Sequence, residues 1–239
     1  MKTLIVIFVF FCCTAMESYS QYYSATYAHN LLLPDLNAFE GVLIFSAEFW
    51  RYDLDLDGIG PDSDNENDLI IKIGSVFNFR TMKGKYFLDQ EPIFSKKHIL
   101  KGELALPEWA IEEDSTRQIG GYNCLLAKAD VCGRSFVVWF TPEIPVNCGP
   151  WKLWGLPGLI VDAQSVDGAI DIKLKSLKNH DTAPIEPTVE ETITPSEYSR
   201  LLKQSFDRLG RALKSMDAGR DYDVDASVKI QIADKSLLP

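Results

Sequence analysis

The chain has 239 residues and a formal net charge of −10 at neutral pH, and 46% of its residues are hydrophobic. This acidic balance argues against partners that attract basic patches, so neither nucleic acid nor an anionic membrane surface is expected. The length suits one domain that is large enough to bury a proper core.

The first 20 residues have the layout of a signal peptide. Lys2 precedes an uninterrupted apolar run, Leu4–Phe11, and small residues follow at Ser18 and Ser20. A membrane-spanning helix needs about 20 apolar residues, so this run is too short to cross a bilayer comfortably. We therefore expect cleavage after Ser20 and export of a mature domain, residues 21–239, that has no transmembrane segment. An uncleaved membrane anchor is the alternative.

Short runs of alternating apolar and polar residues recur after this leader, which is the pattern of half-buried strands. Turn residues such as Asp167 and Gly168 separate the runs and indicate hairpins. The pattern predicts an α+β fold that is mainly β, with a strongly curved antiparallel sheet. The expected strands are Val42–Tyr52, Leu69–Phe79, Tyr122–Ala129, Phe136–Thr141 and Ala169–Lys175, with a last one around Val228, Ile230 and Ile232.

One helix is expected near the end of the chain, at residues 194–216. Thr194 and Glu197 have the spacing of a capping box, and Pro195 stands at the first helical position. An apolar stripe at steps of three and four should pack on the sheet, since an isolated helix of this length is marginal in water. The stripe consists of Leu202, Phe206, Leu209, Leu213 and Met216.

The most distinctive motif lies within residues 118–163. Its centre reads Gly155, Leu156, Pro157, Gly158, Leu159 and Ile160, and Trp139–Pro145 and Gly149–Pro150 precede it. This segment resembles the GLPGLI family of exported proteins from Bacteroidetes-type bacteria. The resemblance implies an exported, uncharacterised protein over the whole mature chain, and it brings no established activity and no catalytic residues.

The glycines and the proline of this motif predict a rigid bend that enters a buried strand, because glycine permits close backbone approach and proline fixes φ. The alternative is a ligand or partner site shaped by the backbone together with Trp151 and Trp154. We favour the structural role, since glycine and proline at fixed spacing mostly report geometry.

The densest run of carboxylates is the acidic loop at residues 53–68. Aspartates at alternate positions, followed directly by Gly58, resemble the start of a calcium loop. The expected ligands of calcium, the one cofactor that the sequence suggests, are Asp53, Asp55, Asp57, Asp62 and Asp64. A solvated acidic loop between two strands is the alternative, because Leu54 and Leu56 look like the end of a strand.

Three cysteines remain in the mature chain, and an exported protein can keep a disulfide. Cys124 lies in an expected strand, and Cys148 follows a proline-bent segment that leads back to the sheet. Cys132 lies in an expected hairpin turn. We therefore predict a Cys124–Cys148 bridge.

No common catalytic or phosphate-binding motif is present in the sequence, so no catalytic or cofactor-binding residue is assigned. The leading hypothesis is a non-enzymatic binding or assembly protein of the bacterial envelope, periplasmic, secreted or associated with the outer membrane. Its partner would be an envelope protein or an apolar ligand. Two alternatives stay open: a hydrolase that uses carboxylates such as Glu143, Asp162 and Asp171, and a carrier of an acyl chain or peptide in a concave sheet.

Overall fold

The computed structural model describes residues 22–31, 39–56, 75–93 and 96–216. Its strands are β1 (Tyr22–Leu31), β2 (Phe39–Phe45), β3 (Phe49–Leu54), β4 (Val76–Thr81), β5 (Tyr86–Ile93), β6 (Lys96–Glu103), β7 (Ala110–Ile119), β8 (Tyr122–Val131), β9 (Arg134–Thr141), β10 (Leu159–Ser165) and β11 (Ile170–His180), and its helix is α1 (Pro195–Met216). No helix among these residues is long and apolar enough to cross a membrane.

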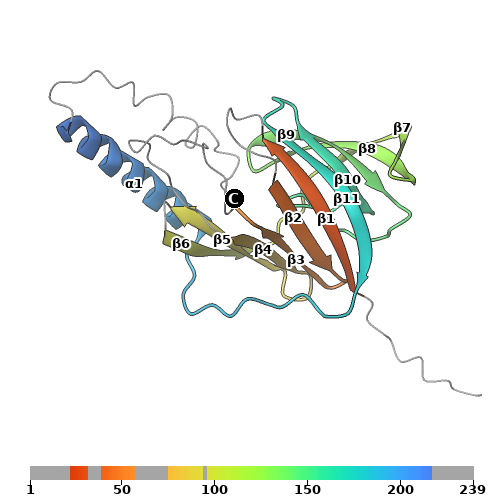
Figure 1. Cartoon of the computed structure of the whole chain (residues 1–239), viewed down its shortest axis with the longest axis horizontal. Helices are drawn as coiled ribbons and strands as arrows, with labels where there is room; N and C mark the ends of the chain where they lie inside the picture. The colour runs from red at the N-terminus through yellow and green to blue at the C-terminus, as the bar shows by residue number, and fades with distance from the viewer. Residues whose placement is uncertain (1–21, 32–38, 57–74, 94–95, 217–239) are drawn as a thin grey trace, which may run out of the picture.

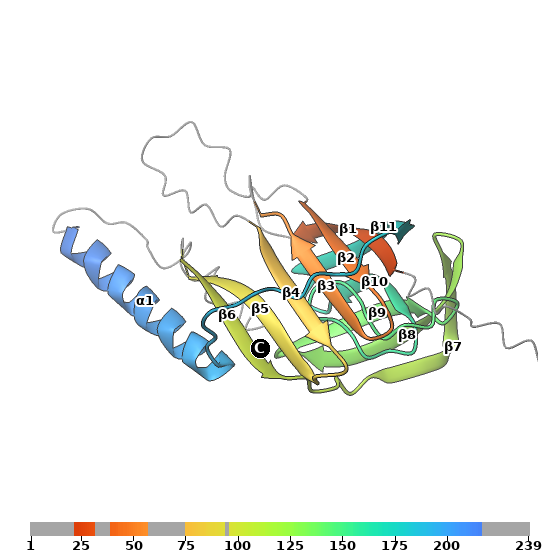
Figure 2. The same cartoon turned by 90° about the horizontal axis from the view of Figure 1, so that it is seen from below.

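The strands form one antiparallel sheet in the order β6-β5-β4-β3-β2-β1-β11-β10-β9-β8-β7. The chain runs outward from β1 to the edge strand β6, crosses to the opposite edge at β7, and returns strand by strand to β11, which pairs with β1. The sheet curves along its length, and α1 lies beside β6, far from β7 (Figures 1 and 2). The predicted fold class is therefore confirmed.

The main hydrophobic core covers one face of this sheet, which we term the inner face. Buried side chains from β1, β2, β3 and β8–β11 meet there, among them Tyr27, Phe45, Trp50, Val138, Phe140 and Ile172. Alternation explains the arrangement: Ile170 and Ile172 of β11 point inward, while Asp171 and Lys173 point to the opposite, outer face.

Residues 142–158 connect β9 to β10 along the chain and pack on the inner face of the sheet. We term them the inner segment. Trp154 lies 5.8 Å from Trp50, measured between ring centroids, and Trp151 lies 6.2 Å from Phe136. Trp109 donates a hydrogen bond of 2.8 Å to the carbonyl of Trp154. The middle of the inner segment, residues 148–156, is thus part of the core.

Two ion pairs lie on the inner face, and one of them joins the inner segment to β5. Arg80 lies opposite Trp50, so it shares the inner face, where its guanidinium pairs with Asp89 at 3.0 Å. Lys152, of which 3% is exposed, pairs with Glu91 at 2.9 Å. Burial lowers the pKa of Lys152, but Glu91 and Asp89 outweigh this effect and raise it. Lys152 therefore stays charged inside the protein.

The motif glycines explain how the chain turns from the inner segment into β10. Gly155 has a φ of +96°, which favours glycine, and a Cβ there would lie 2.6 Å from the side chain of Leu106. A Cβ at Gly158 would lie 2.2 Å from the carbonyl oxygen of Thr141. Both positions therefore have a geometric reason to be glycine.

Helix α1 begins with the expected capping box and packs on β6. The Glu197 N–H donates to the Thr194 hydroxyl at 3.2 Å, and the Thr194 N–H donates to the Glu197 carboxylate at 2.8 Å. Tyr198, Leu201 and Leu202 pack against Ile93 and Leu100. Of the expected stripe, Leu202, Phe206 and Leu209 are half-buried, and the side chains of Leu213 and Met216 lie outside the described residues. The packing residues therefore begin one turn earlier than expected.

Several strand boundaries differ from the expectation. The run Val42–Tyr52 forms two strands, because the Ser46 side chain accepts hydrogen bonds from the N–H groups of Glu48 and Phe49 and closes a turn. Only the end of Leu69–Phe79 coincides with β4, and residues 69–74 lie outside the described residues, as does the expected strand around Val228–Ile232.

The predicted disulfide is wrong, since the cysteines that the structure describes, Cys124, Cys132 and Cys148, are all free. Leu125 and Ala127 of β8 point into the core, so Cys124 points to the outer face. Cys148 is buried in the core on the inner face. The sheet lies between the two sulfur atoms. Because neighbouring residues of a strand point to opposite faces, the position of Cys124 in a strand could not show that its side chain points away from Cys148.

Replacing Gly158 by alanine should lower the free energy of unfolding by about 2–4 kcal/mol, because the added methyl group collides with the backbone of β9. Gly210→Ala is the matched control, since a Cβ at that helical position meets nothing within 4 Å. It should stabilise the protein by about 1 kcal/mol. Urea denaturation measures both changes, and equal effects would contradict the steric explanation.

Replacing Lys152 by methionine should cost about 3–5 kcal/mol of stability, because the largely buried Glu91 is left without its partner. The double variant Lys152→Met with Glu91→Leu should regain most of this loss, since it removes both charges. Chemical denaturation of the four proteins of this double-mutant cycle gives the coupling energy. A double variant as unstable as Lys152→Met would show that the pair does not fix the inner segment.

Candidate functional site

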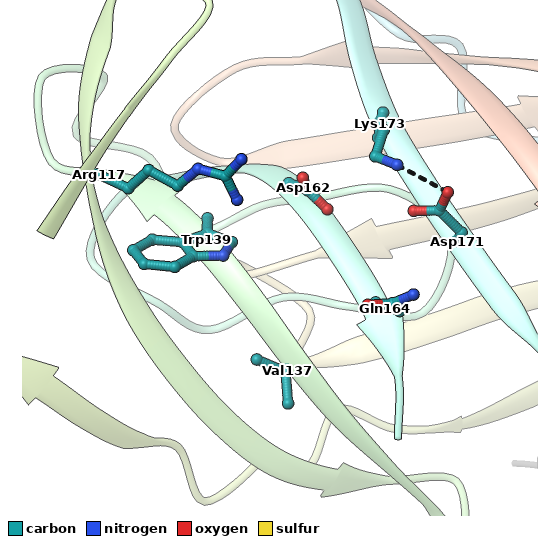
Figure 3. Close-up of a pocket in the computed structure, with 7 residues that line it drawn as sticks. All are labelled: Arg117, Val137, Trp139, Asp162, Gln164, Asp171 and Lys173. Carbon is teal, nitrogen blue, oxygen red and sulfur yellow. Dashed lines mark hydrogen bonds and ion pairs between the residues drawn. The ribbon is translucent and has the colours of Figure 1, made fainter. Parts of the chain in front are cut away.

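A pocket of about 200 Å³ lies on the outer face of the sheet, opposite the core (Figure 3). We term it the outer-face pocket. Four strands supply its lining, which consists of Arg117 from β7, Val137 and Trp139 from β9, Asp162 and Gln164 from β10, and Asp171 and Lys173 from β11.

Strand register arranges six of these side chains in two rows. In the first row, Asp162 lies directly opposite Trp139 on one side and Lys173 on the other. In the second row, Gln164 lies directly opposite Val137 and Asp171. Residues opposite one another on adjacent strands share a face, so the rows form one continuous patch.

A β-bulge in β10 places Asp162 in this patch. Ile160 pairs with Phe140 and Asp162 pairs with Trp139, so Val161 is the extra residue. Without the bulge, Asp162 would fall opposite Val138, which points into the core, because a shift of one residue moves a side chain to the other face. The bulge therefore carries the carboxylate to the outer face, as bulges near functional sites often do.

The Asp162 carboxyl lies in an unusual electrostatic setting. It is half-buried, and burial raises its pKa above the ordinary value; Lys173 opposes the shift, and the nearby Asp171 adds to it. Lys173 is itself engaged, since its ammonium pairs with Asp171 at 2.8 Å. Within the described part of the chain, no donor forms a hydrogen bond with the Asp162 carboxylate.

Trp139 and Gln164 also present polar groups to the pocket. Trp139 is half-buried, and the guanidinium of Arg117 lies 5.8 Å from its ring centroid. Figure 3 shows the indole nitrogen on the side of the ring that faces Asp162 and Gln164. Among the residues that the structure describes, the side chains of Trp139 and Gln164 have no hydrogen-bond partner. The pocket thus combines a free donor, a free acceptor and an amide that can do both.

The structure brings together two of the three carboxylates that the sequence suggested as a pair. Asp162 and Asp171 line the same pocket from neighbouring strands. Glu143 does not line it, and its carboxylate accepts two hydrogen bonds of 2.8 Å from Asn123. Sequence reasoning missed the remaining lining residues, of which Trp139 lay within the motif region without an assigned role.

The family motif itself touches a different, more apolar pocket. This second pocket measures about 300 Å³ and is lined by Ala47, Pro145, Val146, Asn147 and Pro157. None of these side chains titrates, and the two tryptophans that could have served a ligand, Trp151 and Trp154, are buried in the core. Of the motif residues, Gly155, Leu156, Gly158, Leu159 and Ile160 do not line this pocket.

The acidic loop lies largely outside the described residues, including Asp57, Asp62 and Asp64. Asp53 belongs to β3, and its carboxylate accepts hydrogen bonds of 2.8 and 2.9 Å from Arg51. Asp55 is the first residue after the end of β3, and it is exposed. Within the described residues no group of three or more His, Cys, Asp or Glu side chains is placed to hold a metal ion. Calcium binding by the loop stays a prediction.

If the loop binds calcium, millimolar calcium should raise the melting temperature by several degrees, and a chelator should reverse the shift, because an ion that binds only the folded state stabilises it. Asp55→Asn combined with Asp57→Asn should abolish the shift. Asp207→Asn, an exposed change on α1, is the control. If calcium leaves the melting temperature unchanged, the loop is a solvated acidic loop and not a calcium site.

Comparison with known proteins finds a sequence match for one segment and a structural likeness for the fold. Residues 130–162 match the model of a family described as "Protein of unknown function (Porph_ging)". This segment includes the inner segment, the motif and the β9 and β10 residues of the outer-face pocket up to Asp162. No curated protein matches the chain in sequence.

The fold is similar to that of PNGF-II. One structure, in space group C2, has a TM-score of 0.56 and 16% identity, and covers 77% of this chain and 33% of the PNGF-II chain. A second, in space group P21, has a TM-score of 0.53 and 17% identity, with coverages of 77% and 34%. The chain thus spans about a third of the length of PNGF-II, and at this identity the likeness shows the fold alone.

Proposed function

We propose that the chain is an exported binding protein of the bacterial envelope, belongs to the GLPGLI family, and holds a small polar ligand in the outer-face pocket. The leader at residues 1–20 and the motif at 155–160 support export and the family. The observation that carries the binding site is the half-buried Asp162 carboxylate, which has no hydrogen-bond donor among the described residues.

The outer face is a better place for a ligand than the inner face. The inner segment already fills the inner face with large buried side chains, among them Trp151, Leu153 and Trp154. An acyl chain or peptide in the concave sheet would have to displace these residues, and each displaced aromatic would lose well over 1 kcal/mol of burial. This argues against the carrier alternative.

The outer-face pocket is also well supported for binding. Its polar groups stand on four paired strands, so their positions are fixed before a ligand arrives, which reduces the entropic cost of binding. A ligand that donates to Asp162 and accepts from the Trp139 indole would replace loosely held water with directed hydrogen bonds.

A thermal-shift screen of the full exported chain tests this proposal. The panel contains neutral sugars, amino acids, dicarboxylates and polyamines, and at least one compound should raise the melting temperature. Asp162→Asn should weaken its binding about tenfold, because a charge-assisted hydrogen bond is lost. Asp130→Asn, an exposed change on the outer face of β8, should leave binding unchanged. A panel without binders, or equal binding by Asp162→Asn, would contradict the proposal.

A second candidate function is hydrolysis by the carboxyl pair. The raised pKa of Asp162 suits a proton donor, whereas Asp171 is held by Lys173 in an ion pair. Two carboxyl groups in different environments are the usual arrangement for general acid and base. Conversion of a bound compound, followed by mass spectrometry and abolished by Asp171→Asn without loss of binding, would favour the enzyme over the binding protein.

A further inference from the structure

The charges of the outer-face pocket disfavour a charged ligand. Two cations, Arg117 and Lys173, and two carboxylates, Asp162 and Asp171, line it, so their formal charges cancel. Lys173 pairs with Asp171, and the guanidinium of Arg117 lies near the Trp139 ring. A ligand with a net negative charge would approach Asp162 and Asp171, and one with a net positive charge would approach Arg117 and Lys173, so the lining favours neither.

The side chains of the pocket that have no hydrogen-bond partner among the described residues match the hydrogen-bonding pattern of hydroxyl groups. Asp162 only accepts hydrogen bonds when ionised, the indole N–H of Trp139 only donates, and the Gln164 amide does both. A hydroxyl group is at once a donor and an acceptor, so neighbouring hydroxyls on one ligand can satisfy all three side chains. Dicarboxylates and polyamines carry a net charge that this lining, whose formal charges cancel, does not balance.

The apolar lining and the volume of the outer-face pocket further restrict the class of ligand. The indole of Trp139 and the side chain of Val137 present apolar area beside the polar groups, which suits the C–H groups of a sugar ring. The volume of about 200 Å³ is comparable with one such ring. Because Gln164 and Lys173 are exposed, the pocket opens to solvent, and the rest of a longer chain could continue over the sheet.

Resting on the binding function proposed above, we infer that the ligand of the outer-face pocket is a neutral carbohydrate, one ring of which lies between Trp139, Asp162 and Gln164. Asp162 accepts hydrogen bonds from its hydroxyls, Trp139 donates to one of its oxygens, and Gln164 bridges a neighbouring pair. Sugar residues at the end or within a glycan both fit an open site on a sheet face.

Calorimetry with the full exported chain tests this inference. The probes are the methyl glycosides of glucose, galactose, mannose, xylose and N-acetylglucosamine, together with starch, xylan and galactomannan in affinity electrophoresis. Glucuronic acid and glucosamine serve as charged counterparts. At least one neutral probe should bind, and glucuronic acid and glucosamine should bind about tenfold more weakly than that probe.

Three variants locate the binding. Asp162→Asn exchanges an acceptor for a donor, Trp139→Phe keeps a ring but removes the N–H, and Gln164→Ala changes an exposed side chain that the fold does not need. Each should weaken binding of the neutral probe about tenfold, with an unchanged melting temperature in the Gln164 variant. Asp130→Asn should bind as the unchanged protein does.

The outcomes separate this inference from the proposed function. Binding of an amino acid, dicarboxylate or polyamine that depends on Asp162, without binding of any neutral sugar, would overturn the carbohydrate inference and leave the pocket standing. Neutral sugars that bind equally well to all three variants would place the site elsewhere and overturn the inference. If no probe of either panel binds, both the inference and the proposed function fail.

Discussion

The ion pair between Lys152 and Glu91 joins the inner segment to β5 inside the protein. The pairing with Glu91 on β5 helps to keep a charge at Lys152 in the core, because an unpaired buried charge is costly. Together with the packing of Trp151 and Trp154, the contact holds the inner segment against the inner face. The motif bend then delivers the chain into β10, whose bulge presents Asp162 on the outer face.

How much of the fold the sequence could predict depended on how regular each element is. Ile170, Ile172 and Leu174 alternate cleanly with charges, and Thr194 with Glu197 forms a regular capping box, so β11 and α1 were predictable. The strands β1 and β5–β7 were not. The exposed edge strand β7 carries few apolar residues, and on β4 and β5 the inner face holds Arg80 and Asp89, which breaks the alternation that sequence reasoning relies on.

The site was less predictable than the fold because it depends on register. Asp162 and Asp171 could be suspected as a pair from the chain, but their neighbours Trp139 and Lys173 follow only from which residues face one another across three strands. The bulge at Val161 reverses the face that simple alternation would give to Asp162. The cysteines illustrate the same limit, since Cys124 and Cys148 lie on opposite sides of the sheet.

The order of the strands also dictates when the molecule can be completed. The centre of the sheet is the pairing of β1 with β11, in which Tyr22 meets His180. Each half can form its hairpins locally as the chain grows, yet the halves join only after nearly all the strands have been synthesised. Contacts between such distant residues slow folding, because the entropy of closing a long loop is lost before the contacts form. Until then β1 has an unpaired edge that invites aggregation, so the growing chain needs protection longest at its own beginning.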